Sequence, residues 1–234
     1  MSTKQEQKRK ERVAQKDENF QMPIELLQPW STFVMKTRLP LPIFDKMIKI
    51  TDEIVDNAEN EKSHGHNLAG QIKDELWVDH EILERENVLG FFLDVVRNFV
   101  IQQTCQQEPF EREKILAEEW YTQMLSMWII SQKDNEYNPC HVHTECAVST
   151  VMYLKIPKYL PTRNPHTTPG AIEFTGVPSR SPTFLGRGTL EVQPRVGDFF
   201  IFAADQQHSV YPFQTQDGNG ERRSISMNAA FEAK

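Results

Sequence analysis

Residues 138–146 read Asn-Pro-Cys-His-Val-His-Thr-Glu-Cys and place two histidines and a carboxylate at alternate positions. In an extended strand, alternate side chains point to the same face. His141, His143 and Glu145 are therefore expected to converge on one small volume. Imidazole nitrogens and carboxylate oxygens are both ligands of divalent transition metals. The pattern predicts part of a metal site.

A further ligand is expected from much later in the chain. A mononuclear non-haem iron site needs three protein ligands on one face of an octahedron, commonly two histidines and a carboxylate. His208 follows the apolar run Phe199–Phe202 after a short loop. In a barrel of strands, such a residue can lie opposite a ligand pair on a distant strand. We therefore take His208 as the distant ligand.

A cation follows on the last predicted strand, Arg222–Phe231. Arg222 and Ser224 fall on one face of that strand, so a guanidinium and a hydroxyl can bind the same carboxylate. Arginine suits this task because its donors form a fixed, bidentate fork. Arg223 points to the other face and is expected to be structural.

The histidine stretch has two simpler interpretations. Cys140 and Cys146 flank the histidines, so a closed zinc site is an alternative. Alternation puts both cysteines on the opposite face unless the strand bulges, and we expect them to be packing residues. The histidines could also be two polar side chains satisfied on a strand, but His208 and Arg222 disfavour that interpretation.

The chain is helical first and rich in strands afterwards. Apolar residues at helical spacing predict helices from Pro42 to about Asn60 and from Asn87 to about Gln106. Runs of β-prone residues between turn signals then predict strands at Glu75–Val78, Trp120–Ile130, Val148–Ile156, Gly170–Phe174, Leu190–Val192, Phe199–Phe202 and Arg222–Phe231. This order predicts an α+β protein with a mainly β core, an antiparallel jelly roll backed by the earlier helices.

The domain organisation follows from the same change in character. Residues 1–18 are almost entirely polar and charged, and we expect a disordered tail there. Residues 19–234 are expected to form a single domain. Within it, residues 19–118 supply a mostly helical support and residues 119–234 the jelly-roll core.

Composition limits the class of partner. The 234 residues include 38% hydrophobic residues, which is enough for one sizeable core, and carry a net charge of −7. That charge disfavours a general nucleic-acid or anionic-membrane surface. Three cysteines, an odd number, fit a reducing compartment. We expect a soluble cytoplasmic protein.

Three stretches together resemble the Fe(II)/2-oxoglutarate oxygenases of bacteria and tailed phages, a prolyl-hydroxylase-like branch of that superfamily. They are Asn138–Pro157, Pro194–Phe202 with the following His208-Ser209-Val210, and Arg222–Asn228. The segment Asn67–Ile72 and Trp128 are also similar to phage members, which implies that the protein could act inside a phage-infected host cell. The resemblance covers the C-terminal half well. It implies a double-stranded β-helix that binds Fe(II) and uses 2-oxoglutarate and dioxygen.

The resemblance leaves two ligand sets open. The superfamily's usual His-x-Asp or His-x-Glu pattern is met by His143 and Glu145, with His208 as the third ligand. In the resembling branch His-x-His recurs, which implies His141, His143 and His208, with Glu145 orienting a histidine. His143 and His208 belong to both sets.

The resemblance also implies a place for the cosubstrate and a type of reaction. Arg222 and Ser224 would bind the distal carboxylate of 2-oxoglutarate, and Tyr153 would line the same pocket. The reaction would hydroxylate an unactivated C–H bond of a small molecule, peptide or protein, a peptidyl proline among them, with succinate and carbon dioxide as coproducts. The rivals are a non-enzymatic jelly roll that keeps a metal for stability and a cupin-like metalloenzyme without 2-oxoglutarate. The sequence carries no signal for the oligomeric state.

Overall fold

A computed structural model describes residues 32–57, 71–162, 168–176 and 188–234. The segment 1–18, for which we predict a disordered tail, lies outside the described residues. Within them, the strands form a six-stranded sheet in the order β1-β8-β5-β10-β3-β2 and a four-stranded sheet in the order β4-β9-β6-β7. Every pairing between neighbouring strands is antiparallel.

The elements have the following bounds. The larger sheet consists of β1 (Met35–Arg38), β8 (Asp198–Ala203), β5 (Val148–Lys155), β10 (Arg222–Ala233), β3 (Trp120–Gln132) and β2 (Glu75–Trp77). The smaller sheet consists of β4 (Asn138–His141), β9 (His208–Val210), β6 (Ile172–Thr175) and β7 (Thr189–Val192). The helical elements are α2 (Leu41–Asp56), α3 (His80–Arg85), α4 (Leu89–Gln107), the 3-10 turn η3 (Pro109–Glu111) and α5 (Arg112–Ala117).

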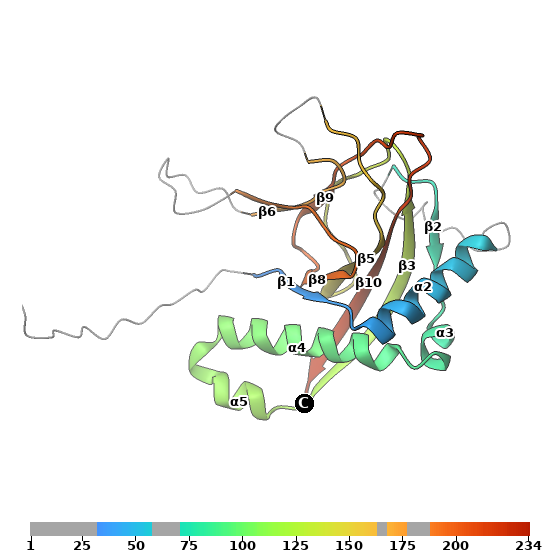
Figure 1. Cartoon of the computed structure of the whole chain (residues 1–234). Helices are drawn as coiled ribbons and strands as arrows, with labels where there is room; N and C mark the ends of the chain where they lie inside the picture. Colours follow the sequence, from blue (N-terminus) through green and yellow to red (C-terminus); the bar gives the residue numbers. More distant parts are fainter. Residues whose placement is uncertain (1–31, 58–70, 163–167, 177–187) are drawn as a thin grey trace, which may run out of the picture.

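The two long helices form where their sequence patterns predict. Helix α2 has Pro42 in its first turn, where the missing N–H has no intrahelical partner to lose. In α4, Phe92, Val96 and Phe99 recur at spacings of four and three and are buried on one face. Figure 1 shows both helices lying along the larger sheet. The six-residue helix α3 was not predicted, because it is too short to show a helical period.

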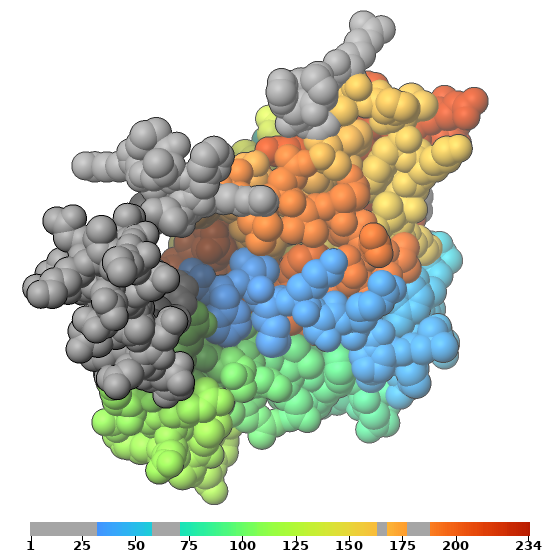
Figure 2. All heavy atoms as spheres, turned by 60° about the vertical axis from the view of Figure 1, so that its left-hand side comes forward, coloured from blue at the N-terminus to red at the C-terminus, as the bar shows by residue number. Residues whose placement is uncertain are grey.

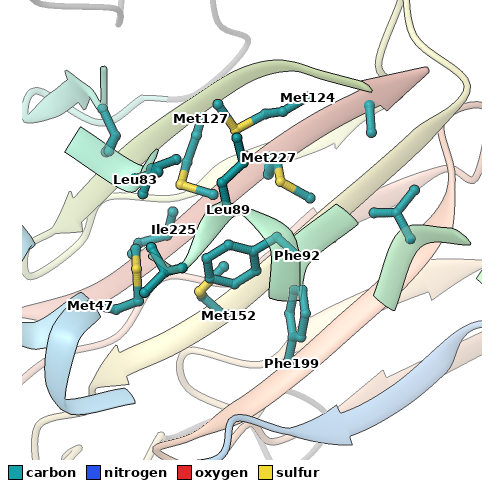
Figure 3. Close-up of a cluster of buried hydrophobic side chains, with 14 of the residues drawn as sticks. Met47, Leu83, Leu89, Phe92, Met124, Met127, Met152, Phe199, Ile225 and Met227 are labelled. Carbon is teal, nitrogen blue, oxygen red and sulfur yellow. The ribbon is translucent and has the colours of Figure 1, made fainter. Parts of the chain in front are cut away.

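The central strands of the larger sheet are buried on both faces, so they read as continuous apolar runs. In β8, Phe199 and Ile201 belong to the core beneath the helices, while Phe200 and Phe202 belong to a second core between the sheets. The period of two along a strand produces this division. Figure 3 shows the helix-side core, where the rings of Phe92 and Phe199 meet edge to face with centroids 5.9 Å apart.

The first half of the chain also contributes to the sheet. Strands β1 and β2 are its two edge strands and pair with β8 and β3. In Figure 2 the segment 32–57 runs as a blue band between the orange C-terminal strands and the green segment that holds α4 and α5. The architecture is the predicted α+β jelly roll with supporting helices. In the described part of the chain, no helix has both the length and the apolar character needed to cross a membrane.

Candidate metal and cosubstrate site

Three histidines are brought together by the pairing of two short strands, β4 and β9. Strand β4 ends at His141, and His141 lies directly opposite His208 at the start of β9. His143 follows in a loop, and its own backbone N–H donates a hydrogen bond to the carbonyl oxygen of Ala204, 2.9 Å away. The ligand atoms of His141, His143 and His208 all lie within 4.8 Å of one another.

The predicted extended strand from His141 to Glu145 is wrong. Strand β4 stops at His141, its pairing with β9 is irregular, and Glu145 has a φ of 60° in the left-handed region. A chain that turns in this way loses the alternation of side chains. The histidines converge because of a tertiary strand pairing and a tight loop.

Hydrogen bonds to backbone carbonyls fix which nitrogen of two of the rings faces its neighbours. His141 Nδ1 lies 2.7 Å from the carbonyl oxygen of Pro139, and His208 Nδ1 lies 2.9 Å from that of Gln206. A carbonyl only accepts, so each Nδ1 carries the proton and each Nε2 keeps its lone pair. The Nε2 atoms of His143 and His208 lie 3.4 Å apart. This arrangement is the one in which histidines bind a metal.

Burial keeps the rings of His143 and His208 neutral. His208 is 5% exposed, and burial together with His141 lowers its pKa to about 3. Burial and the neighbouring His141 likewise lower the pKa of His143 to about 4. The charged form of imidazole is penalised by desolvation and by nearby positive charge. Both rings are therefore neutral at pH 7, which is the form that can donate a lone pair to a metal.

The other sequence-predicted ligand lies apart from this cluster. Glu145 lines the same cavity but is exposed, and the cluster of converging ligand atoms in the described residues contains only the three histidines. Cys140 is exposed and Cys146 is half-buried, and neither joins the cluster. A closed cysteine–histidine zinc site therefore does not form in this structure.

Arg222 is a buried cation without a carboxylate partner among the described residues. It is 1% exposed, and one Nη atom donates to Gln132 Oε1 at 2.8 Å. Its Nε and its other Nη atom have no hydrogen-bond partner in the described part of the chain. Its guanidinium carbon lies 4.6 Å from the centre of the Tyr153 ring. A buried charge needs an anion or several hydrogen bonds, so Arg222 is poised for an acidic ligand.

Strand β10 carries this cation into the cavity that the histidines line. Arg222, Ser224, Ser226 and Asn228 alternate along one face of β10, and all four line a cavity of about 510 Å³. Tyr153, which we predicted at this pocket, is fully buried beneath Arg222 and does not line the cavity.

Arg223 lies on the opposite face, as expected. It forms ion pairs with Asp52 of α2, at 2.6 Å, and with Glu221, at 2.7 Å. It therefore ties β10 to the helical layer and has no part in the cavity.

Two residues of the site escaped the sequence analysis. Gln132 ends β3 directly opposite Arg222 and holds its guanidinium, while the Gln132 amide nitrogen donates to the backbone carbonyls of Glu136 and Tyr211. Glu75 on β2 lines the cavity and is 1% exposed. The available signal for Glu75 was an acidic residue at the start of the predicted strand Glu75–Val78. Nothing local distinguished Gln132, because its role depends on the register between β3 and β10.

The fold and the site together define a class, the metal-dependent enzymes built on a double-stranded β-helix. Residues 126–228, which contain the three histidines and Arg222, match the model of a 2OG-Fe(II) oxygenase family. This part of the chain, less than half of its 234 residues, is similar to that family, and the protein is an oxygenase that uses Fe(II) and 2-oxoglutarate. No curated protein matches the sequence.

Solved structures with this fold include two prolyl hydroxylases. One is a Pseudomonas putida prolyl-4-hydroxylase, with a TM-score of 0.51 and 16% identity over 86% of this chain and 93% of that chain. The other is a Trichoplax adhaerens prolyl hydroxylase in complex with a peptide fragment of a hypoxia-inducible factor. Its TM-score is 0.51, with 10% identity over 98% of this chain and 94% of that chain. At these identities the likeness concerns the fold.

Proposed function

We propose that this oxygenase hydroxylates an unactivated C–H bond of a peptide or small molecule, with a peptidyl proline as the first substrate to test. Support for an oxygenase reaction comes from the family match. Support for hydroxylation and for a peptide comes from structures of the same fold described as prolyl hydroxylases, one of them with a bound peptide. When bound, iron and 2-oxoglutarate supply the oxidising chemistry, with succinate and carbon dioxide as coproducts.

His141, His143 and His208 hold the metal in this proposal. Three imidazoles form a donor set that fits Fe(II), although it would also fit zinc, copper or nickel. The carbonyls of Pro139 and Gln206 orient two of the rings through their Nδ1 protons. Glu145 is left outside the metal's ligands and free to face solvent or substrate.

Arg222 and Ser224 bind the distal carboxylate of 2-oxoglutarate. The observation that carries this assignment is the buried guanidinium with two nitrogens unpaired in the described residues. Gln132 and the face of Tyr153 hold the guanidinium in place while leaving those donors available. Because water has little access to the group, a charge-assisted pair forms there more strongly than at the surface.

An anaerobic titration tests the proposal. Protein loaded with Fe(II) is titrated with 2-oxoglutarate while the weak visible charge-transfer band is recorded, and succinate is measured after air is admitted. We expect Arg222→Ala to weaken 2-oxoglutarate binding by about 100-fold, equivalent to about 3 kcal/mol for a lost charged hydrogen-bond pair. Arg223→Ala is the matched control, because that arginine lies on the other face of the strand, and it should leave the affinity unchanged.

Pyruvate sharpens the test because it has the keto acid but no distal carboxylate. The natural protein should bind 2-oxoglutarate far more tightly than pyruvate, and Arg222→Ala should nearly abolish the difference. A protein that shows neither the band nor succinate formation contradicts the proposal and favours a structural jelly roll or a metalloenzyme without 2-oxoglutarate. Succinate formation stimulated by proline-containing peptides, and not by matched alanine peptides, would support the peptidyl substrate.

A further inference from the structure

Glu75 is, beside Arg222, a second side chain with an ionisable group that is buried at the wall of the cavity. It pairs across β2 and β3 with Ile130, which in turn pairs with Ser224 on β10. The side chains of these three residues line the same cavity, while Leu76 faces the helix-side core. Glu75 therefore projects into the cavity from the edge strand β2. Strand β10, which carries Arg222, lies two strands away in the same sheet.

One oxygen of the Glu75 carboxyl group is buried without a hydrogen-bond partner among the described residues. Its Oε2 atom is inaccessible and accepts no hydrogen bond there, and none of the ion pairs found in that part of the chain includes it. The carboxylate of Glu136 adds repulsion, and it is itself occupied by the backbone N–H groups of Lys73 and Lys133. Burial and Glu136 raise the pKa of Glu75 to about 7. A cation that enters the cavity would therefore stabilise the ionised form of Glu75.

The neighbouring wall also suits a cation. Trp128 lines the cavity two residues before Ile130 on the same face of β3. The face of an indole ring attracts ammonium and guanidinium groups. The cavity of about 510 Å³ lies within the range of ligand sites that hold molecules larger than one small acid. Space therefore remains for part of a second molecule beside 2-oxoglutarate.

We propose that Glu75 determines specificity by binding a cationic nitrogen, an ammonium or a guanidinium, of the substrate. This inference rests on the proposed function, because it assigns Arg222 to 2-oxoglutarate and leaves Glu75 as the buried charge that faces the substrate. The substrate class is thus narrowed to basic peptides or amines, such as a peptide with a lysine or arginine close to the hydroxylated residue.

Calorimetry with paired probes tests this assignment on the full chain loaded anaerobically with Fe(II), with and without 2-oxoglutarate. The probes are N-acetyl-lysine amide against N-acetyl-norleucine amide, and N-acetyl-arginine amide against N-acetyl-citrulline amide. Within each pair the size is similar and the charge differs. We expect the natural protein to prefer the cationic probe about tenfold or more, and Glu75→Gln to reduce that preference to less than about threefold.

Glu145→Gln is the matched control, since Glu145 is the other acidic residue that lines the cavity and it is exposed. It should retain most of the preference. The proposal is overturned if the natural protein shows no preference, if Glu75→Gln keeps it, or if Glu145→Gln removes it. Because the probes can be titrated without 2-oxoglutarate, failure of 2-oxoglutarate binding would be seen separately and would count against the proposed function alone.

Discussion

At the scale of single residues, the chemistry of the site depends on nitrogens that face away from it. The Nδ1 atoms of His141 and His208 are bound to carbonyls, which directs both Nε2 lone pairs toward one point. Arg222 shows the converse situation, because one nitrogen is held by Gln132 and the others await a ligand. In each case a hydrogen bond to a neighbouring group of the protein determines which nitrogen atoms remain available to bind a ligand in the cavity.

The proposed ligand set predicts the iron content of single variants. Replacing His141, His143 or His208 by alanine should weaken Fe(II) binding by more than about 100-fold, since each loss leaves two ligands and an incomplete face. Glu145→Ala should retain iron at the natural stoichiometry. Metal analysis after dialysis against a weak chelator measures both. Loss of iron in Glu145→Ala together with its retention in His141→Ala would instead favour the set His143, Glu145 and His208.

Glu75 predicts a pH dependence of stability. Its pKa rises from 4.5 to about 7 on folding, so between these values the unfolded chain has lost a proton that the folded chain keeps. Stability therefore falls as pH rises through this window, by roughly 3 kcal/mol once pH exceeds 7. Glu75→Gln should lack this loss.

Urea unfolding of both proteins at pH 5 and pH 8 measures the difference. The variant should gain relative to the natural protein at pH 8 and differ little at pH 5. The same curves show whether Glu75→Gln folds, which the calorimetric test requires. An equal pH dependence in the two proteins would mean that Glu75 titrates normally.

At the scale of elements, an ion-pair network joins helix α2 to strand β10. Arg223 is 3% exposed on its side chain and bridges Asp52 and Glu221, whose side chains are 42% and 19% exposed. Lys155 on β5 also pairs with Asp52. The network lies on the face of β10 opposite the cavity, so it ties the sheet to the helical layer and is expected to affect stability rather than cosubstrate binding.

Removing Arg223 should destabilise the protein more than removing Asp52. Arg223→Ala removes the buried ion-pair partner of Glu221, whose own side chain is partly buried. This change should cost about 3 kcal/mol of unfolding free energy. Asp52→Asn removes an exposed partner and should cost less than about 1 kcal/mol. Chemical unfolding at pH 7 measures both. Equal losses of unfolding free energy would show that the buried Arg223 contributes no more to stability than the exposed Asp52 does.

At the scale of the whole molecule, the two faces of the larger sheet have different roles: one packs against the helices and the other lines the cavity. Its helix-side face packs Met152, Phe199, Ile225 and Met227 against α2 and α4, while its inner face carries the cavity. The period of two along each strand assigns neighbouring residues to different tasks. The large core can therefore support the site without contributing a side chain to it.

Phe92→Ala tests that separation. Phe92 is fully buried in α4 and contacts Phe199 across the helix–sheet interface. The change should cost about 3–5 kcal/mol of unfolding free energy by leaving a cavity. The 2-oxoglutarate affinity of the folded protein should stay within about twofold of the natural value, as measured by the anaerobic titration at low temperature. A large loss of affinity would show that the helical layer controls the site directly.

The sequence predicted the elements whose signal is long or repeated. The helices α2 and α4 and the strands β3, β5, β8 and β10 lie within a few residues of their predicted bounds. It also predicted the face of β10 on which Arg222 and Ser224 lie, because alternation holds in a regular strand of that length. The jelly roll, the oxygenase class and its two cofactors followed from the motifs and are confirmed.

The stretch 138–146 shows where sequence reasoning ended. Its residue types determined that a metal could bind there, because imidazole and carboxylate groups have that chemistry wherever they lie. Which of them meet was decided by the pairing of β4 with β9 and by the turn at Glu145, neither of which has a local signal. The same holds for Gln132 and Glu75, whose surroundings come from strands distant in sequence. Chemistry is a property of the side chain, whereas burial, partners and register are properties of the folded chain.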